Sequence, residues 1–181
     1  MAAAPKTAQD ILVKELKEIY SAERQLSRAV PKLVKKIGSE PLRAKLDERR
    51  EQGARLVEEL DNVFEEMDVT RARPKNVAVE GLIEDINLHV EEIQEPTLLD
   101  SELLAAVQKV EHYCIAAWGT SASLGRLLGE QQTVQVMERA LEEGKRFDQD
   151  LTDLAEKEIN PAMLASGERQ GTRSGRERQQ V

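Results

Sequence analysis

The feature that most constrains this chain is a helical seam between residues 104 and 128 that one acidic residue interrupts. Its members recur every three or four residues, which places them on one face of a helix: they are Leu104, Val107, Glu111, Cys114, Trp118, Ser121, Gly125 and Leu128. Such a face normally packs into a protein core. A carboxylate there costs several kcal/mol unless a cation, a proton or hydrogen bonds compensate it. The seam therefore raises the question of what Glu111 meets inside the protein.

Three further segments carry seams of the same kind, each apolar at both ends and polar near the middle. The first has Glu23 at its centre, and the second has Arg49 with Gln52 at its flank. The last has Asp148, with Gly144 one turn away. The four helices that we expect from these seams run over about residues 7–37, 39–67, 101–128 and 130–159.

The composition and the connections between these segments predict an all-α fold. Hydrophobic residues make up 40% of the chain and charged residues 33%, but aromatic residues only 3%, which suits long amphipathic helices. Residues 70–75 read as a loop, and residues 79–93 as a shorter helix before Pro96. Short turns favour antiparallel hairpins, whereas the long middle connection permits a crossover. We therefore expect a ferritin-like antiparallel four-helix bundle with a short extra helix in the crossover between the second and third long helices.

The domain boundaries and the expected surroundings of the protein follow from simple patterns. We expect a flexible N-terminus over residues 1–6, the bundle over 7–160, and a disordered, locally basic tail over 161–181 after Asn160 and Pro161. The net charge of −8 disfavours binding to nucleic acid or an anionic membrane. No apolar run approaches the roughly 20 residues of a membrane span, and we see no signal peptide. The expected compartment is the cytoplasm, and the single cysteine excludes an internal disulfide.

The polar residues of the four seams should meet, because antiparallel packing brings the helix midpoints together. We predict a central polar cluster whose members are Glu23, Arg49, Gln52, Glu111, Cys114 and Asp148. Buried carboxylates in such a bundle are typical of dimetal proteins, which use two glutamates and two Glu-x-x-His motifs. The sequence has no Glu-x-x-His motif. We expect His112 to point outward and pack against the crossover, and His89 to be a surface or hydrogen-bonding residue.

Four stretches of the chain resemble the bacterial YciE/YciF family: residues 20–26 (YSAERQL), 78–84 (AVEGLIE), 108–113 (QKVEHY) and 151–155 (LTDLA). The resemblance extends over about residues 8–158. It implies a ferritin-like fold, an association with stress responses, and a dimetal site.

The departures from that family fall on the seams. Where the family usually carries His, Glu, Glu and Glu, this chain has Arg49, Gln52, Cys114 and Gly144. Only Glu23, Glu111 and Asp148 keep the acidic character that the resemblance leads one to expect in the interior. An arginine keeps its charge and can bridge two carboxylates through its forked donors.

These observations leave three hypotheses about function. In the first, the metal centre has degenerated, no metal is bound, and Arg49 replaces the cations in a structural or interaction protein whose partner is unknown. In the second, which the resemblance alone implies, the protein is a di-iron or di-manganese oxidase or peroxide-handling enzyme. A mononuclear site of Glu23, Glu111 and Asp148, with Cys114 as a further soft ligand, is its simplest form. The third is a purely helical scaffold. In each case a homodimer is expected.

Overall fold

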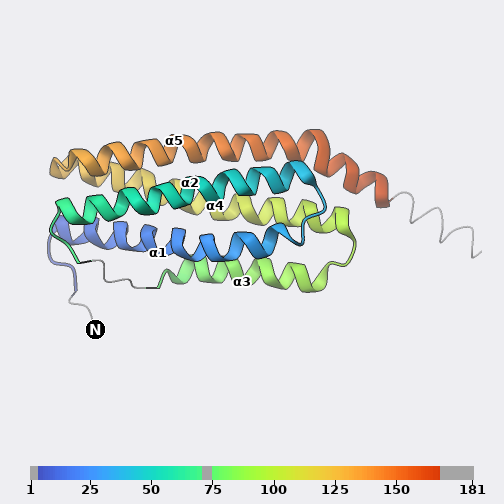
Figure 1. Cartoon of the computed structure of the whole chain (residues 1–181), viewed down its shortest axis with the longest axis horizontal. Helices are drawn as coiled ribbons and strands as arrows, with labels where there is room; N and C mark the ends of the chain where they lie inside the picture. The colour runs from blue at the N-terminus through green and yellow to red at the C-terminus, as the bar shows by residue number, and fades with distance from the viewer. Residues whose placement is uncertain (1–3, 71–74, 168–181) are drawn as a thin grey trace, which may run out of the picture.

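The computed structural model describes residues 4–70 and 75–167, and five long helices account for most of them (Figure 1). Their bounds are Ala8–Val34 for α1, Glu40–Glu66 for α2, Val77–Glu92 for α3, Pro96–Leu128 for α4 and Gln131–Leu154 for α5. Within these described residues there is no β-strand, which confirms the predicted all-α class. None of the described helices combines the length and hydrophobicity needed to cross a lipid bilayer.

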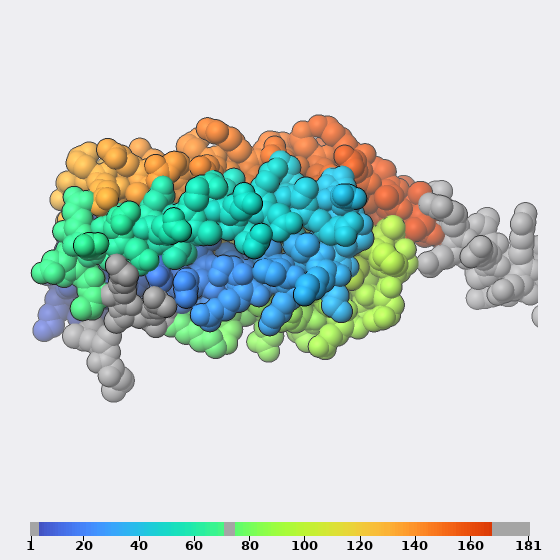
Figure 2. Space-filling view, viewed as in Figure 1, coloured from blue at the N-terminus to red at the C-terminus, as the bar shows by residue number. Residues whose placement is uncertain are grey.

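Four of the helices form a bundle in the circular order α1, α2, α5, α4, and each is antiparallel to its neighbours (Figure 1). The fifth, α3, lies outside the bundle against α1 and α4. It carries the chain back along the length of the bundle, so that α2 and α4 run in the same direction. In the space-filling view, α1 and α2 form the face between α5 and α3 (Figure 2). The arrangement confirms the ferritin-like bundle and the extra helix in its crossover.

The ends of the helices mostly carry the predicted caps. Thr7 and Asp10 form a reciprocal capping box at the start of α1, and Ser39 caps α2. Gly129 ends α4 with a φ of 78°, a left-handed conformation that glycine adopts without a steric penalty. The first helix ends at Val34, three residues before the predicted position.

The start of α4 differs from the prediction. We expected Asp100 or Ser101 to cap this helix, but it begins at Pro96, and Glu95 is its cap. Proline suits a first helical position because its missing N–H would have no partner there. Asp100 is instead buried, and its carboxylate accepts hydrogen bonds from the backbone N–H groups of Gly38 at 2.8 Å and Ser39 at 2.7 Å. An acid expected to cap its own helix thus holds the turn between α1 and α2.

The end of the last helix also differs from the prediction. Pro161 was expected to stop it, but α5 widens into a π-helical turn over Ala155–Ile159 and the chain stays helical through residue 167. A proline crowds the preceding turn of a regular helix, and the wider turn immediately before it relieves that crowding. The predicted tail boundary at residue 161 is therefore wrong for 161–167. The rest of that predicted tail, residues 168–181, lies outside the described residues, as do residues 1–3.

Candidate functional site

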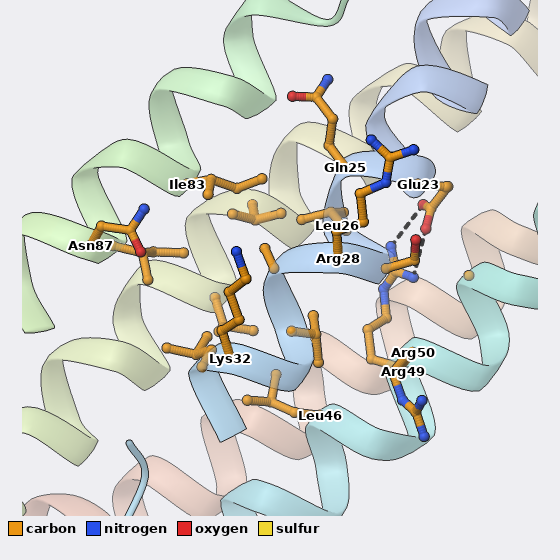
Figure 3. Close-up of a pocket in the computed structure, with 18 of the residues that line it drawn as sticks. Glu23, Gln25, Leu26, Arg28, Lys32, Leu46, Arg49, Arg50, Ile83 and Asn87 are labelled. Carbon is orange, nitrogen blue, oxygen red and sulfur yellow. Dashed lines mark hydrogen bonds and ion pairs between the residues drawn. The ribbon is translucent and has the colours of Figure 1, made fainter. Parts of the chain in front are cut away.

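A buried arginine lies at the centre of the bundle and joins three helices. Arg49 of α2, only 7% exposed, donates from Nε to Glu111 Oε2 of α4 at 2.7 Å. Its Nη1 and Nη2 donate to the two carboxylate oxygens of Glu23 of α1, at 3.1 and 2.9 Å (Figure 3). The two carboxylates are 1% and 2% exposed. Both edges of the guanidinium are therefore occupied by carboxylates that water hardly reaches.

The charges of this cluster stabilise one another against the cost of burial. Burial by itself disfavours a charged Arg49, but Glu23 and Glu111 outweigh it and raise the pKa of Arg49 well above its ordinary value. Burial raises the pKa of Glu111, and the nearby Arg49 only partly opposes this rise. Glu111 Oε1 has no hydrogen-bond partner among the described residues. Two carboxylates and one guanidinium together carry one negative charge. Within the cluster, burial favours a proton on Glu111.

The walls of the cluster are shaped by one aromatic ring and two glycines. The ring of Trp118 lies 5.3 Å from Arg49 Cζ, within the range of a cation–π interaction. A Cβ atom at Gly53 would lie 2.5 Å from Glu23 Oε2, and one at Gly144 would lie 2.6 Å from Glu111 Oε1 and overlap the Trp118 ring. Glycine at these two positions therefore provides the space that the charged side chains fill.

Cys114 and Gln52 lie beside the cluster, as predicted, but they contribute less to it. Cys114 is 2% exposed, and burial, followed by the charge of Glu23, raises the pKa of its thiol well above the ordinary value. This thiol is therefore protonated and poorly nucleophilic. Gln52 is half-buried and lines a small cavity of about 20 Å³ together with Arg49, Trp118 and Gly144.

Asp148 does not join the cluster, and this part of the prediction is wrong. Its Oδ2 lies 3.1 Å from Nε2 of His112, an exposed residue, and its Oδ1 accepts from Gln108 Nε2 at 3.1 Å. From Gly144 a helical seam can step to residue 147 or to residue 148. The larger apolar side chain, Phe147, takes the core position and turns Asp148 to the flank. His112 points outward as predicted, but it faces α5 rather than the crossover helix.

Sequence reasoning assigned no role to Trp118, Gly53 or Asn76. Trp118 belongs to the predicted seam of residues 104–128, two turns after Glu111, and Gly53 lies one turn after Arg49. Their positions near charged seam residues were the available signal. Asn76 is 3% exposed, caps α3, and donates to Glu18 O at 3.1 Å and to Tyr113 Oη at 2.7 Å. It fastens the crossover to α1 and α4, a role that nothing in the sequence pattern indicates.

The side chains of the cluster do not fit two metal ions as they lie. Both oxygens of Glu23 and one oxygen of Glu111 accept from Arg49, whose guanidinium fills the space between them. Asp148 faces another partner. Among the described residues, no group of three or more His, Cys, Asp or Glu side chains is arranged to hold a metal ion. The cation at the centre of the cluster is the guanidinium of Arg49.

A ferritin-like four-helix bundle with carboxylates buried at its centre is the class of protein that the fold and this site define. The sequence family described as "Domain of unknown function (DUF892)" matches residues 7–164. Protein YciF of Escherichia coli (strain K12) is 40% identical over 156 residues, which cover 86% of this chain and 94% of that protein. The chain therefore belongs to the YciE/YciF family.

Solved structures agree with this assignment. The crystal structure of the E. coli stress protein YciF matches with a TM-score of 0.82 and 39% identity over 86% of this chain and 99% of that one. YcfI of Rhodopseudomonas palustris, a proposed structural protein, matches with a TM-score of 0.80 and 30% identity over 84% and 97% of the two chains. A Xanthomonas campestris protein at 17% identity shares the fold, with a TM-score of 0.72 over 91% and 99% of the two chains.

Proposed function

We propose that this protein is a stress-associated member of its family that works without metal, as a structural or protein-interaction component in the cytoplasm. In this proposal Arg49 replaces the metal cations of a ferritin-like centre. The observation that carries it is the pair of contacts from one guanidinium to Glu23 and Glu111 at the middle of the bundle. The association with stress is the printed description of the E. coli relative, and a structural role is the one proposed for the R. palustris relative.

Electrostatics supports this replacement. A buried carboxylate pair is unstable without positive charge, and a buried arginine is unstable without negative charge. The forked guanidinium satisfies three carboxylate oxygens at once. A proton on Glu111, which the raised pKa of this group favours, would cancel the remaining charge. The permanent charge of Arg49 thus supplies positive charge that metal ions would otherwise provide.

The alternative, a dimetal or mononuclear oxidase, requires carboxylate oxygens that are free to bind a metal. The mononuclear version needs Glu23, Glu111 and Asp148 around one ion, yet Asp148 is paired with His112 at the surface. A metal ion would also have to displace Arg49, whose charge cannot be removed by deprotonation. The arrangement of donors therefore supports the metal-free proposal over the enzyme.

Restoring the usual residues of the family tests this proposal. The variant Arg49→His/Gln52→Glu/Cys114→Glu/Gly144→Glu should gain binding of Fe²⁺ or Mn²⁺ in an anaerobic calorimetric titration, while the unmodified protein shows none. A side chain at residue 144 would crowd Trp118, so a second variant keeps Gly144 and carries the other three changes. Tight binding by the unmodified protein, or no binding by either folded variant, would contradict the proposal.

The proposed assembly is a homodimer, as expected for a ferritin-like protein. Size-exclusion chromatography with light scattering should give twice the chain mass of 20.3 kDa. A monomer mass at high protein concentration would remove the dimer from the proposal and leave the metal-free bundle unaffected.

A further inference from the structure

A cavity of about 420 Å³ lies where α1, α2, α3 and α4 meet. Ile83 and Asn87 of α3 line one side of it, and Leu46 and Arg49 of α2 line the other (Figure 3). Most of its wall is aliphatic, with contributions from Leu26, Val30, Leu33, Ile86, Val107 and Val110. Protein interiors normally hold few voids larger than a water molecule. A mainly aliphatic space of this volume is typical of a ligand pocket.

The rim of this cavity is basic in a protein that is otherwise acidic. Arg28, Lys32 and Lys36 follow one another at every fourth residue of the α1 segment, and Arg50 of α2 also lines the cavity. All four are exposed. Residues 24–39 contain five Lys or Arg and no Asp or Glu, although the whole chain has a net charge of −8. The side chains of Arg28, Lys32 and Lys36 form no ion pair with any other residue that the structure describes. Arg50 has one exposed partner, Asp47, whose Oδ1 lies 3.5 Å from its Nε.

We propose that this cavity binds a fatty acid. The alkyl chain would lie among the aliphatic side chains, and the carboxylate would lie at the rim against Arg28, Lys32, Lys36 and Arg50. The reverse orientation is disfavoured, because Arg49, the cation at the inner wall, already donates its hydrogen bonds to the carboxylates of Glu23 and Glu111. The proposal does not depend on the replacement of metal by Arg49, and each can fail without the other.

Complementary charge selects an anion, and the aliphatic wall selects an alkyl chain. Cationic side chains at a partly exposed rim attract a carboxylate and give weaker binding as the salt concentration rises. The alkyl chain contributes in proportion to the apolar surface that it removes from water. A short carboxylate lacks the second contribution, and a neutral or cationic chain lacks the first. The carboxylate and the alkyl chain of the ligand can therefore be tested separately.

Calorimetric titration with dodecanoate below its micelle concentration tests the ligand class. We expect one dodecanoate per chain, binding at least tenfold weaker for dodecanol, and no binding for butanoate or dodecyltrimethylammonium. Dodecanol binding as tightly as dodecanoate would overturn the proposal, as would an absence of dodecanoate binding. If the protein binds no dodecanoate but sediments together with anionic phospholipid vesicles, the fatty-acid proposal is overturned and the cavity rim is instead a membrane-binding surface.

Two pairs of variants test the location. Val90→Trp should fill the cavity and weaken dodecanoate binding at least tenfold, whereas Leu88→Trp, on an exposed part of the same helix, should leave it unchanged. Arg28→Gln/Lys32→Gln should weaken binding about tenfold, because it removes two of the exposed cations at the rim. The matched pair Lys14→Gln/Lys35→Gln removes two charges from outside the cavity and should have no effect.

The charge variants decide the outcome if Val90→Trp does not fold, since their changes lie on exposed side chains. Unchanged dodecanoate affinity in Arg28→Gln/Lys32→Gln would overturn the proposal. An equal loss in both charge pairs would also overturn it, because the effect would then come from net charge rather than from the rim of this cavity.

Discussion

The charged residues at the two sides of α4 have contrasting surroundings. On one side Glu111 meets Arg49 in an interior where both partners are less than a tenth exposed. On the other side His112, the next residue, meets Asp148 with its own side chain 67% exposed. Each pair joins a carboxylate to a nitrogen-containing side chain, but only the second pair is open to water. A buried pair is strongly destabilised when one partner is lost, whereas an exposed pair contributes little. The depth of a charged side chain, more than the presence of an ion pair, therefore determines whether the stability of the fold depends on it.

The largest expected effect is that of truncating the buried cation. Arg49→Met should lower the free energy of unfolding by about 3–5 kcal/mol at neutral pH, because Glu23 and Glu111 would remain buried without a counter-charge. Arg55→Met is the matched control, since Arg55 lies on the same helix and its contact with Glu143 is exposed. For this control, urea unfolding should show a loss of at most about 1 kcal/mol in the free energy of unfolding. Equal losses in the two variants would remove the distinction between the buried and exposed pairs.

The next effect concerns the space around the cluster. Gly144→Ala should destabilise the protein by about 1–2 kcal/mol, because the added Cβ would overlap the Trp118 ring and crowd Glu111, and overpacking outweighs the gain in helix propensity. Gly81→Ala, in α3, meets no atom within 4 Å and should stabilise the protein by about 0.5–1 kcal/mol. Thermal unfolding of the two variants should thus give shifts of opposite sign. Stabilisation by both would show that the cluster is not closely packed.

The pH dependence of stability separates the two regions further. Because the pKa of Glu111 is raised in the folded protein, the folded state binds more protons than the unfolded state above the ordinary value of 4.5. The contribution of Glu111 to the free energy of unfolding therefore falls as the pH rises from 4.5 through the raised pKa. The fall is at most about 1.4 kcal/mol per pH unit. Glu111→Gln should flatten the unfolding free energy over this range. An unchanged pH profile in this variant would contradict a buried, proton-binding Glu111.

The smallest effect is expected at the exposed pair. Asp148→Asn should change the free energy of unfolding by less than about 1 kcal/mol, because its partner His112 is largely in water. Chemical denaturation at neutral pH measures this change directly. A loss as large as that of Arg49→Met would show that Asp148 belongs to the central cluster, as the sequence pattern suggested.

Periodicity predicted the helices and most of the buried cluster because both depend on local spacing. Glu23, Arg49 and Glu111 lie at positions where only one choice of seam was consistent with the apolar residues around them. At residue 144 two continuations were open, and the choice between Phe147 and Asp148 depended on the shape of the neighbouring helices. That shape is a tertiary property, and local spacing contains no information about it.

The remaining differences have the same origin. Asp100 lies within hydrogen-bonding distance of Gly38 and Ser39 only because two distant turns meet at one end of the bundle. Pro161 reads as a helix stop from its missing N–H group, yet a π turn accommodates it. The cavity beside Arg49 is bounded by four helices and leaves no pattern in any one of them. Such features arise from packing between segments.

In the proposed function, Arg49 takes the place of metal ions. Elemental analysis of the unmodified protein, purified without chelator from cells grown with iron and manganese, tests it most directly. We expect far less than one equivalent of any transition metal per chain, with no rise in the unfolding temperature when Fe²⁺ or Mn²⁺ is added. Two tightly bound ions per chain would contradict it and would make the dimetal enzyme the better description.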